Sequence, residues 1–420
     1  MNKKTAITLS LFINYFVFAI LLNSVGIVIL KSQQVYGVDE LQASTLELFK
    51  DLPIAIVSFL IASYLPRIGY KRAMLAGLAF VTLACIGMFF GNSFRSAQIL
   101  FATVGVSFAL IKVSVYTLIG TITNGEKEHN SLMSRIEGFF MFGIALAYFL
   151  FPAFNQESAP NSWLNVYWLL AGLSALSFLF LFRVDFGEKE IITGTNLSKD
   201  FAEMMKLLLK LIIIVFVVSA FLFVMIEQGI MTWLPTFNER VLNFSTDLSD
   251  VAKENISIQM ASILAISLGV GRILAGILSK RVSWIWILTT CIILAMGVVL
   301  FILPKVVTAD SVLIESFSDI PLLAYTFPLV GLFIAPIYPL LNSVVLSAFP
   351  KHLHSHITGL IVVFSALGGT LGSRIIGYLF KSVGAETAFY YTLIPMALLL
   401  LAFFILKNLT VKTKQFYKIE

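Results

Sequence analysis

Charge is scarce in this chain of 420 residues. Only 12% of the residues are Asp, Glu, Lys or Arg, while 59% are hydrophobic, and the mean hydropathy is +0.94. A soluble domain carries about 25% charged residues and has too little interior to hide this much apolar surface. The composition excludes a soluble globular protein and predicts an integral membrane protein.

Cysteine and histidine are also rare, with two and four residues respectively. Cys85 and Cys291 lie inside apolar segments and lack metal-ligand spacing, so we expect two buried apolar side chains and no disulfide framework. A metal site at His352, His354 and His356 is conceivable, but histidines in connections are more often solvated. The sequence also lacks a phosphate-binding loop, a nucleophile elbow and a hydrolytic carboxylate pair. We therefore expect no enzyme activity, no metal and no cofactor.

Long apolar runs are abundant instead. Segments of about 20 apolar residues, the length that crosses a hydrocarbon core, recur along nearly the whole chain. The first is too long for a signal peptide and no cleavage site follows it, so it is expected to be retained as a helix. The expected fold class is an all-α membrane protein with twelve spans, at 7–30, 44–64, 73–91, 97–123, 131–153, 163–182, 208–235, 257–277, 284–303, 321–348, 357–381 and 385–406.

Lysine and arginine concentrate in the connections that share a side with the two termini. The positive-inside rule then places both termini in the cytoplasm. The net charge of +6 follows from this topology and requires no nucleic-acid partner, although a basic inner face also favours anionic lipids. The longest inner connection divides the spans six and six. The expected organisation is a six-helix bundle at 1–182, a linker with a short amphipathic helix at 183–206, a second six-helix bundle at 207–406 and a cytoplasmic tail at 407–420.

A short basic turn follows the second span, and a weaker copy of it, Gly276–Arg281, follows the eighth. With the twelve spans and the central linker, this resembles the major facilitator superfamily over essentially the whole length. The family's loop pattern, Gly-x-Leu-x-Asp-Arg-x-Gly-Arg-Arg/Lys, is met by Leu65, Arg67, Gly69, Lys71 and Arg72, and is broken at Ser63 and Pro66. The resemblance implies two pseudo-symmetric bundles around a central cavity. Because Pro66 stands where the family has an aspartate, the ion pairs by which that aspartate locks the loop are not expected here.

Three short sequence segments resemble those of the fucose:proton symporter branch, namely Gly69-Tyr70-Lys71, Leu22-Asn23 and Pro336-Ile337-Tyr338-Pro339. Asn23, Tyr338 and Asn342 are accordingly expected to contact substrate. That branch carries an aspartate in the first span and a glutamate in the fourth. The corresponding positions are held here by Ser24 and by Lys112 or its neighbour Ile111. The expected cavity is therefore unusually cationic.

Apart from residues near span ends, such as Arg135 and Lys210, eight charged residues are stranded inside the expected spans, where a charge costs at least ~2.5–3.5 kcal/mol and is kept only beside a cavity or a partner. They are Glu47, Lys50, Asp51, Lys112, Glu137, Glu227, Arg272 and Arg374. In the family these residues would fall on helices that line or flank the cavity. We therefore expect most of them to serve transport.

Lys112 and Arg374 are the candidate substrate-binding cations. Lys112 has two readings, a structural ion pair with Glu137 or Asp51, or a cavity cation for an anionic or strongly polar substrate, which is preferred. Arg374 lies too deep to reach water easily and is the second choice. Gln228 and Trp233 supply an amide and an aromatic face of the kind sugar sites use, although Trp233 fits an interfacial belt equally well.

The acidic residues are candidates for proton coupling or gating. Spacings of three and four put Glu47, Lys50 and Asp51 on one helical face. Glu227 is the preferred proton carrier, on condition that no permanent cation holds it ionised. Glu137 is the second, because Lys112 or Arg135 could pair with it.

Arg272 either extends its side chain to the inner membrane surface or forms an inner-gate ion pair. Glycine and serine positions suggest where helices touch. Gly269, Gly271 and Gly276 in the eighth span permit close contact, and small residues at 365, 369 and 373 form a stripe along the eleventh. The resemblance also implies that the seventh helix breaks near its outer end, with Gly229 and Pro235 as the flexible points.

The sequence predicts a secondary active transporter that works by alternating access. Proton-coupled uptake of a sugar, a sugar acid or an organic anion is preferred, with the proton gradient as energy source. A drug or metabolite efflux antiporter is the alternative, although 138–143 lacks the Gly-Pro motif of that group; a membrane-embedded enzyme or receptor is a third reading. The expected partners are a small-molecule solute and the lipid bilayer, without nucleic acid. The protein is expected to be a monomer in the inner membrane of a bacterium.

Overall fold

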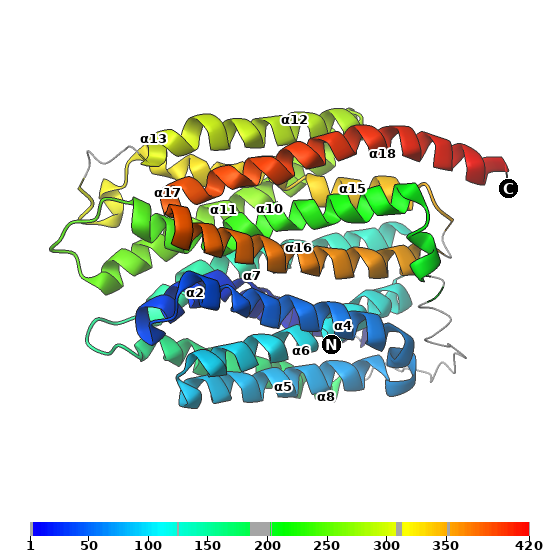
Figure 1. Cartoon of the computed structure of the whole chain (residues 1–420). Helices are drawn as coiled ribbons and strands as arrows, with labels where there is room; N and C mark the ends of the chain where they lie inside the picture. The colour runs from blue at the N-terminus through cyan, green and yellow to red at the C-terminus, as the bar shows by residue number, and fades with distance from the viewer. Residues whose placement is uncertain are drawn as a thin grey trace. The chain divides into compact units, whose positions relative to one another are not determined.

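The computed structural model describes residues 3–123, 126–184, 202, 204–307, 313–350 and 353–419 (Figure 1). Regular structure in these residues is helical, and only two isolated β-bridges occur among them. Eleven of the described helical segments are long and apolar enough to cross a membrane. A twelfth helix, α4 (Thr45–Ile68), is also long enough but carries three charged residues near its start. The expected all-α membrane fold is confirmed.

The chain forms two compact units. The N-terminal unit comprises 1–38 and 45–197, and the C-terminal unit comprises 39–44 and 198–420. Most of the expected linker at 183–206 lies outside the described residues, as does His352. The short segment 39–44 is thus assigned to the C-terminal unit, although the residues before and after it in sequence belong to the N-terminal unit.

The N-terminal unit holds six spans. Its helices are α1 (Lys3–Asn23), α2 (Val25–Tyr36), α4, α5 (Tyr70–Gly91), α6 (Phe94–Ile122), α7 (Glu126–Phe154), η1 (Ser162–Asn165) and α8 (Val166–Arg183). The residues at the helix ends explain where the helices stop and begin, as between α5 and α6. Asn92 adopts a left-handed conformation after α5, and the side chain of Ser93 accepts a hydrogen bond from the Ser96 backbone N–H at the start of α6.

The first span is longer than expected. The expected helix ended at residue 30 and left Lys31 in an outer connection, but α2 continues to Tyr36 and buries Lys31. The Lys31 Nζ donates a hydrogen bond to Asn155 Oδ1 at 2.9 Å and lies 6.0 Å from the centre of the Trp163 ring. The expectation was wrong because an amide acceptor and an aromatic face from distant segments compensate the buried charge.

The C-terminal unit holds the other six spans. Its elements are α3 (Glu40–Ala43), α10 (Leu211–Val241), α11 (Asp250–Leu278), α12 (Trp284–Gly297), η2 (Val298–Ile302), α13 (Leu303–Val307), η3 (Phe317–Asp319), η4 (Leu322–Tyr325), η5 (Phe327–Leu329), α14 (Val330–Ile334), α15 (Ile337–Leu346), α16 (His354–Val383), α17 (Ala385–Ala388), η7 (Phe389–Thr392) and α18 (Leu393–Ile419). The tenth span is divided at Pro336, where α14 gives way to α15. Helix α18 continues as a helix beyond 406, where a tail was expected.

Helix α10 packs along α16 through small residues. A Cβ at Gly368 would lie 2.3 Å from the Phe221 carbonyl oxygen, and one at Gly372 would lie 2.3 Å from that of Met225. These glycines are next to the expected small residues at 365, 369 and 373, of which Ser373 also contacts α10 through the hydrogen bond from Trp233. In the eighth span Gly271 shows such close contact, since its Cβ would lie 2.5 Å from the Leu332 carbonyl oxygen, whereas a Cβ at Gly276 would meet nothing within 4 Å.

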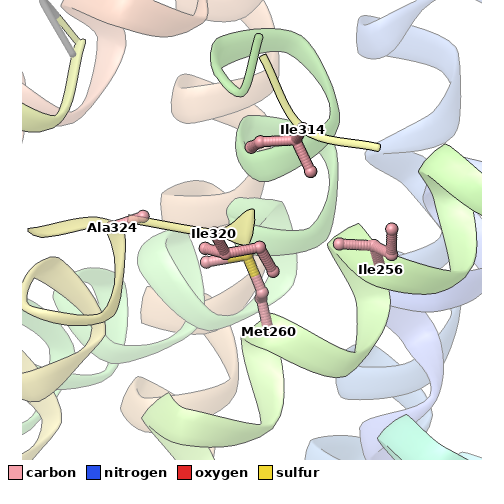
Figure 2. Packing of buried hydrophobic residues seen from close by; sticks show 5 residues of the cluster. All are labelled: Ile256, Met260, Ile314, Ile320 and Ala324. Carbon is pink, nitrogen blue, oxygen red and sulfur yellow. The ribbon is translucent and has the colours of Figure 1, made fainter. Parts of the chain in front are cut away.

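A hydrophobic cluster covers the first turns of α11 (Figure 2). Ile256 and Met260 of α11 meet Ile314, Ile320 and Ala324 from the connection that leads into the tenth span. Backbone hydrogen bonds join Ser245 and Asn243 to Ile314 within the same cluster. Two connections are thus fixed at one end of the C-terminal unit.

Candidate functional site

Lys112 lies in the middle of α6, with an aromatic residue four positions away on either side. Its Nζ is 5.7 Å from the centre of the Phe108 ring and 5.9 Å from that of Tyr116. The four-residue spacing places all three side chains on one helical face. Lys112 is half-buried and forms no ion pair or hydrogen bond with any described residue.

Glu137 of α7 does not pair with Lys112. Its Oε1 accepts a hydrogen bond from the Tyr116 hydroxyl at 2.8 Å, so Tyr116 contacts the cation with its ring and the carboxylate with its hydroxyl. The Tyr15 ring of α1 lies 6.4 Å from that of Tyr116 and 5.4 Å from that of Phe140. We call Tyr15, Phe108, Lys112, Tyr116, Glu137 and Phe140 the Lys112 cluster. Sequence reasoning missed both tyrosines, although Tyr116 could have been found from its spacing to Lys112.

A second polar group lies at the start of α4. The Lys50 Nζ is 2.6 Å from Glu47 Oε1 and 3.6 Å from Asp51 Oδ1, and all three residues are buried. The spacing prediction of one shared face agrees with these distances. The α4 backbone at Lys50 packs closely on Gly105 of α6, which sets the depth of this triad. It contains two carboxylates for one ammonium group.

In the C-terminal unit, Glu227 and Arg272 meet. An Arg272 guanidinium nitrogen lies 3.2 Å from Glu227 Oε1, and the Glu227 side chain is 12% exposed. Arg272 was expected either to extend to the inner membrane surface or to form an ion pair, and the structure contains an ion pair. The condition set for Glu227 as proton carrier, that no permanent cation holds it ionised, is therefore not met in this structure.

Helix α10 is continuous through Gly229 and Pro235, so the break expected there is absent. Trp233 is fully buried, and its Nε1 donates to the Ser373 carbonyl oxygen at 2.8 Å. Its ring lies 5.0 Å from that of Phe380. These contacts with α16 give Trp233 a packing role in this structure. Gln228, next to Glu227, is half-buried.

The remaining predicted substrate residues are spread over several helices. Asn23 donates to the Ala19 carbonyl oxygen at 2.8 Å. The Tyr338 ring stacks on Phe223 at 5.7 Å, and Asn342 is half-buried one turn later. Arg374 is exposed on α16 and forms no ion pair with the described residues.

The basic loop between the second and third spans has one clear contact. Gly69 has φ +90°, a conformation that favours glycine, and precedes α5. The Lys71 Nζ donates to the Phe182 carbonyl oxygen at 2.9 Å, satisfying a carbonyl in the last turn of α8. Arg72 is exposed, and the side chain of Arg67 lies outside the described part of the structure.

Comparison with known proteins agrees with this architecture. The profile of the Major Facilitator Superfamily matches residues 7–373, whereas no curated protein sequence matches significantly. Among solved structures, similar folds occur in a bacterial homologue of the human lysosomal transporter Spinster in an inward-facing, unoccupied conformation (12% identity, TM-score 0.72, 98% of this chain and 97% of that chain covered). They also occur in the nucleoside transporter NupG (14% identity, TM-score 0.73, 97% of this chain and 99% of that chain covered). A third similar fold is that of the fucose:proton symporter FucP of E. coli (12% identity, TM-score 0.64, 96% of this chain and 99% of that chain covered).

At these identities the solved structures support the fold alone. The profile match covers most of the chain, in agreement with the resemblance predicted from the spans and the basic loop. The chain belongs to the Major Facilitator Superfamily and is a transporter rather than an enzyme.

Proposed function

We propose that this protein is a proton-coupled symporter for a small polar solute that carries a negative charge, such as an organic anion or a sugar acid. The observation that carries the proposal is Lys112, a cation in the middle of a membrane helix that pairs with no acid among the described residues. A solute carboxylate would supply the missing partner.

The surroundings of Lys112 suit such a solute. A cation at this depth costs at least ~2.5–3.5 kcal/mol, and aromatic faces at 5.7 and 5.9 Å recover about 0.5–2 kcal/mol each. The remaining cost is offset when an anion binds. The faces of Phe108 and Tyr116, with the hydroxyl of Tyr116 fixed on Glu137, also offer the apolar lining and oriented polar group that small-molecule sites use. The proposal keeps Asn23, Gln228, Tyr338, Asn342 and Arg374 as further candidates for substrate contact, whereas the buried Trp233 is left to the packing of α10 on α16.

Proton coupling is assigned to the triad of α4 rather than to Glu227. Glu227 already faces Arg272, and that cation favours the ionised carboxylate. The triad contains Glu47, Lys50 and Asp51, all three of them buried and in contact. Asp51 is the candidate carrier because it is farther from Lys50 than Glu47 is.

Two of the similar structures are proton symporters, in agreement with the proposed proton coupling. One is a D-xylose–proton symporter and another a fucose:proton symporter, and we extend proton coupling to this chain as a proposal. The same proposal includes a monomer in the inner membrane of a bacterium, with both termini in the cytoplasm. The proton gradient is its energy source.

The test is uptake by purified protein in liposomes under an imposed pH gradient. Neutral sugars, sugar acids and simple organic anions are screened in parallel. We expect an acidic solute to be taken up, and uptake to fall at least about tenfold in Lys112→Ala, the loss of one charge-assisted contact. Lys112→Arg, which retains the charge, should lose less. Lys280→Ala, at an exposed position after α11, serves as the matched control.

Two results contradict the proposal. Equal loss of neutral and acidic uptake in Lys112→Ala would remove the role of charge recognition. Uptake that is indifferent to the pH gradient would remove proton coupling, and Asp51→Asn is expected to produce that indifference while retaining exchange of bound solute.

A further inference from the structure

A groove of about 360 Å³ lies between α5 and α6 in the N-terminal unit. The two helices are in close contact on both sides of it. Near the start of α5, a Cβ at Gly77 would lie 3.1 Å from the Ser107 carbonyl oxygen, and at its end a Cβ at Gly91 would collide with the Ser96 side chain. A Cβ at Gly87, between these two contacts, would meet nothing within 4 Å. The groove is therefore a local gap between helices that otherwise touch.

The size of the lining residues explains the gap. Ala84 and Gly87 of α5 are small, whereas Phe80, Leu83 and Ile99 beside them are 50%, 66% and 64% exposed. Protruding apolar side chains thus flank a surface with little side-chain volume of its own. In a membrane-spanning unit such a surface faces the hydrocarbon of the bilayer.

The polar atoms in the lining already have partners. The Thr103 hydroxyl donates to the Ile99 carbonyl oxygen at 2.8 Å, and the hydroxyl oxygens of Ser96 and Ser93 lie 2.8 Å apart. Neither hydroxyl of the lining requires a hydrogen bond from a ligand. The groove therefore suits a hydrocarbon chain better than a polar solute, which would lose its own hydrogen bonds to water on entering.

The dimensions favour one extended chain over a helix. From Phe80 to Gly87 the groove follows seven residues of α5, or about 10 Å along the helix axis, within the roughly 15 Å of hydrocarbon in one leaflet. A helical segment of that length and of ordinary diameter occupies about 800–1,200 Å³, more than twice the volume of the groove. A neighbouring protein helix could insert only side chains, whereas an acyl chain can lie along the groove.

A cation stands at the end of the groove nearest the membrane surface. Arg95, Ile99 and Thr103 are four residues apart and share one face of α6, so Arg95 lies one turn beyond the lining. Arg95 is exposed and forms no ion pair with a described residue. Its charge is therefore available to an anion at the membrane surface.

Aromatic residues mark the depth of this end. Phe90 in the last turn of α5 and Trp168 in the first turn of α8 are 72% and 45% exposed, and their ring centres lie 5.9 Å apart. Exposed tryptophan at a helix end is typical of the lipid headgroup region. Arg95, in the first turn of α6, belongs to the same set of helix ends. A guanidinium at this level is placed to bind a lipid phosphate through two N–H groups.

We propose that the groove between α5 and α6 binds one acyl chain of an anionic phospholipid, whose phosphate is held by Arg95. The lipid belongs to the leaflet opposite the N-terminus. Van der Waals contact along the groove holds the chain, since helices and lipid tails do not differ in hydrophobicity, and the charge of Arg95 selects the headgroup. The inference concerns the N-terminal unit alone and does not depend on the transported solute.

Photocrosslinking of the full-length protein in phosphatidylcholine liposomes tests the site. Trace amounts of phosphatidylglycerol or phosphatidylcholine, each with a diazirine in one acyl chain, are activated by light, and the labelled peptides are identified by mass spectrometry. We expect label at 80–87 and 96–103. Phosphatidylglycerol should label these segments about fivefold more than phosphatidylcholine, the effect of one basic side chain at the membrane surface.

Two variants separate the chain from the headgroup. Gly87→Phe fills the groove and should lower labelling by both lipids at least about fivefold. Its matched control is Gly172→Phe, at an exposed position of α8 where a Cβ also meets nothing within 4 Å. Arg95→Gln should reduce the ratio of the two lipids to about one while labelling by phosphatidylcholine persists. Arg183→Gln, exposed in the last turn of α8, is the control for charge and should retain the ratio.

Four results overturn the proposal. They are equal labelling by the two lipids in the parent, label spread evenly over the spans, labelling that persists in Gly87→Phe, and a lipid ratio unchanged in Arg95→Gln. Light scattering supplies a separate check on the occupant. A dimer in the parent that becomes a monomer in Gly87→Phe would assign the groove to a second copy of this chain and would also overturn the lipid site.

Discussion

Replacement of Gly372 by alanine should separate α10 from α16. The added Cβ would lie 2.3 Å from the Met225 carbonyl oxygen and 2.8 Å from its Cα, whereas ordinary contact begins at 3.4 Å. The helices must therefore move apart by about 1 Å at this point, since both close atoms belong to the backbone. Gly276 of α11 is the matched control, because a Cβ there meets nothing within 4 Å.

The cost follows from two contacts. Helix association in lipid depends on close packing rather than on a hydrophobic drive, and a gap of 0.5–1 Å forfeits about a quarter to a half of the dispersion energy along it. The hydrogen bond from Trp233 Nε1 to the Ser373 carbonyl oxygen, 2.8 Å long and one residue from Gly372, would also stretch beyond hydrogen-bond range, a loss of about 1 kcal/mol. With an overpacking cost of about 1–3 kcal/mol, Gly372→Ala should destabilise the protein by about 2–4 kcal/mol.

Thermal unfolding of the purified protein in detergent, followed by tryptophan fluorescence, measures this difference. Gly276→Ala should match or slightly exceed the parent, because alanine favours a helix over glycine by about 1 kcal/mol. Gly372→Ala should melt at a clearly lower temperature than Gly276→Ala. Equal melting temperatures would refute the close packing of α10 on α16 in this register.

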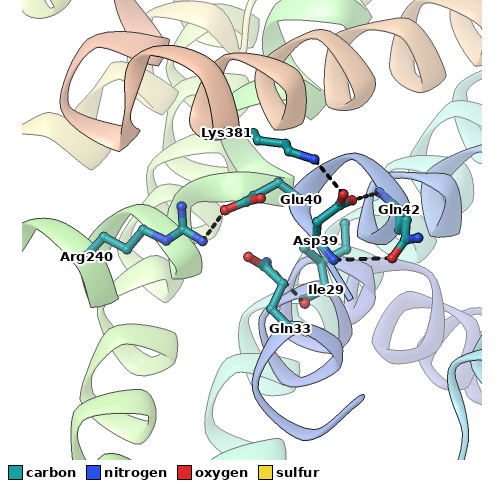
Figure 3. Close-up of polar contacts among 7 residues, drawn as sticks. All are labelled: Ile29, Gln33, Asp39, Glu40, Gln42, Arg240 and Lys381. Carbon is teal, nitrogen blue, oxygen red and sulfur yellow. Dashed lines mark hydrogen bonds and ion pairs between the residues drawn. The ribbon is translucent and has the colours of Figure 1, made fainter. Parts of the chain in front are cut away.

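Two further predictions concern charged groups. Arg272→Ala should destabilise the protein more than Glu227→Gln, because it leaves a carboxylate without its cation in apolar surroundings. The double variant should recover about 1–3 kcal/mol of the summed loss in a double-mutant cycle of thermal unfolding, and simple additivity would contradict the ion pair. The hydrogen bond from Lys381, whose Nζ lies 2.7 Å from Asp39 Oδ2 (Figure 3), lowers the pKa of Asp39 below its usual value. The stabilisation is therefore present above the unfolded pKa of about 3.9 and is lost as the pH falls through the lowered pKa, so Asp39→Asn should lower the temperature of thermal unfolding between about pH 5 and 8 and have a smaller effect in stronger acid. An effect of Asp39→Asn that is as large in stronger acid as between about pH 5 and 8 would contradict the assignment.

Several features of the site follow from local spacing. The contact of Lys50 with both Glu47 and Asp51 could be predicted, because residues three and four apart share a face on any helix. The same rule would have placed Phe108 and Tyr116 beside Lys112. Partners on other helices could not be read in this way, as Glu227 and Arg272 illustrate.

The sequence by itself determined the membrane class, the division into six and six spans and the family, because hydrophobic length and charge placement depend on the bilayer rather than on packing. The tertiary structure alone decided that Lys112 has no acidic partner among the described residues, that Lys31 is buried and that Asp39–Ser44 docks on the C-terminal unit. The close approach of Gly368 and Gly372 to the backbone of α10 illustrates the physical reason. Rotation and depth of each helix are set by the backbones and side chains it meets, and a single residue's rotation changes which side chains become neighbours.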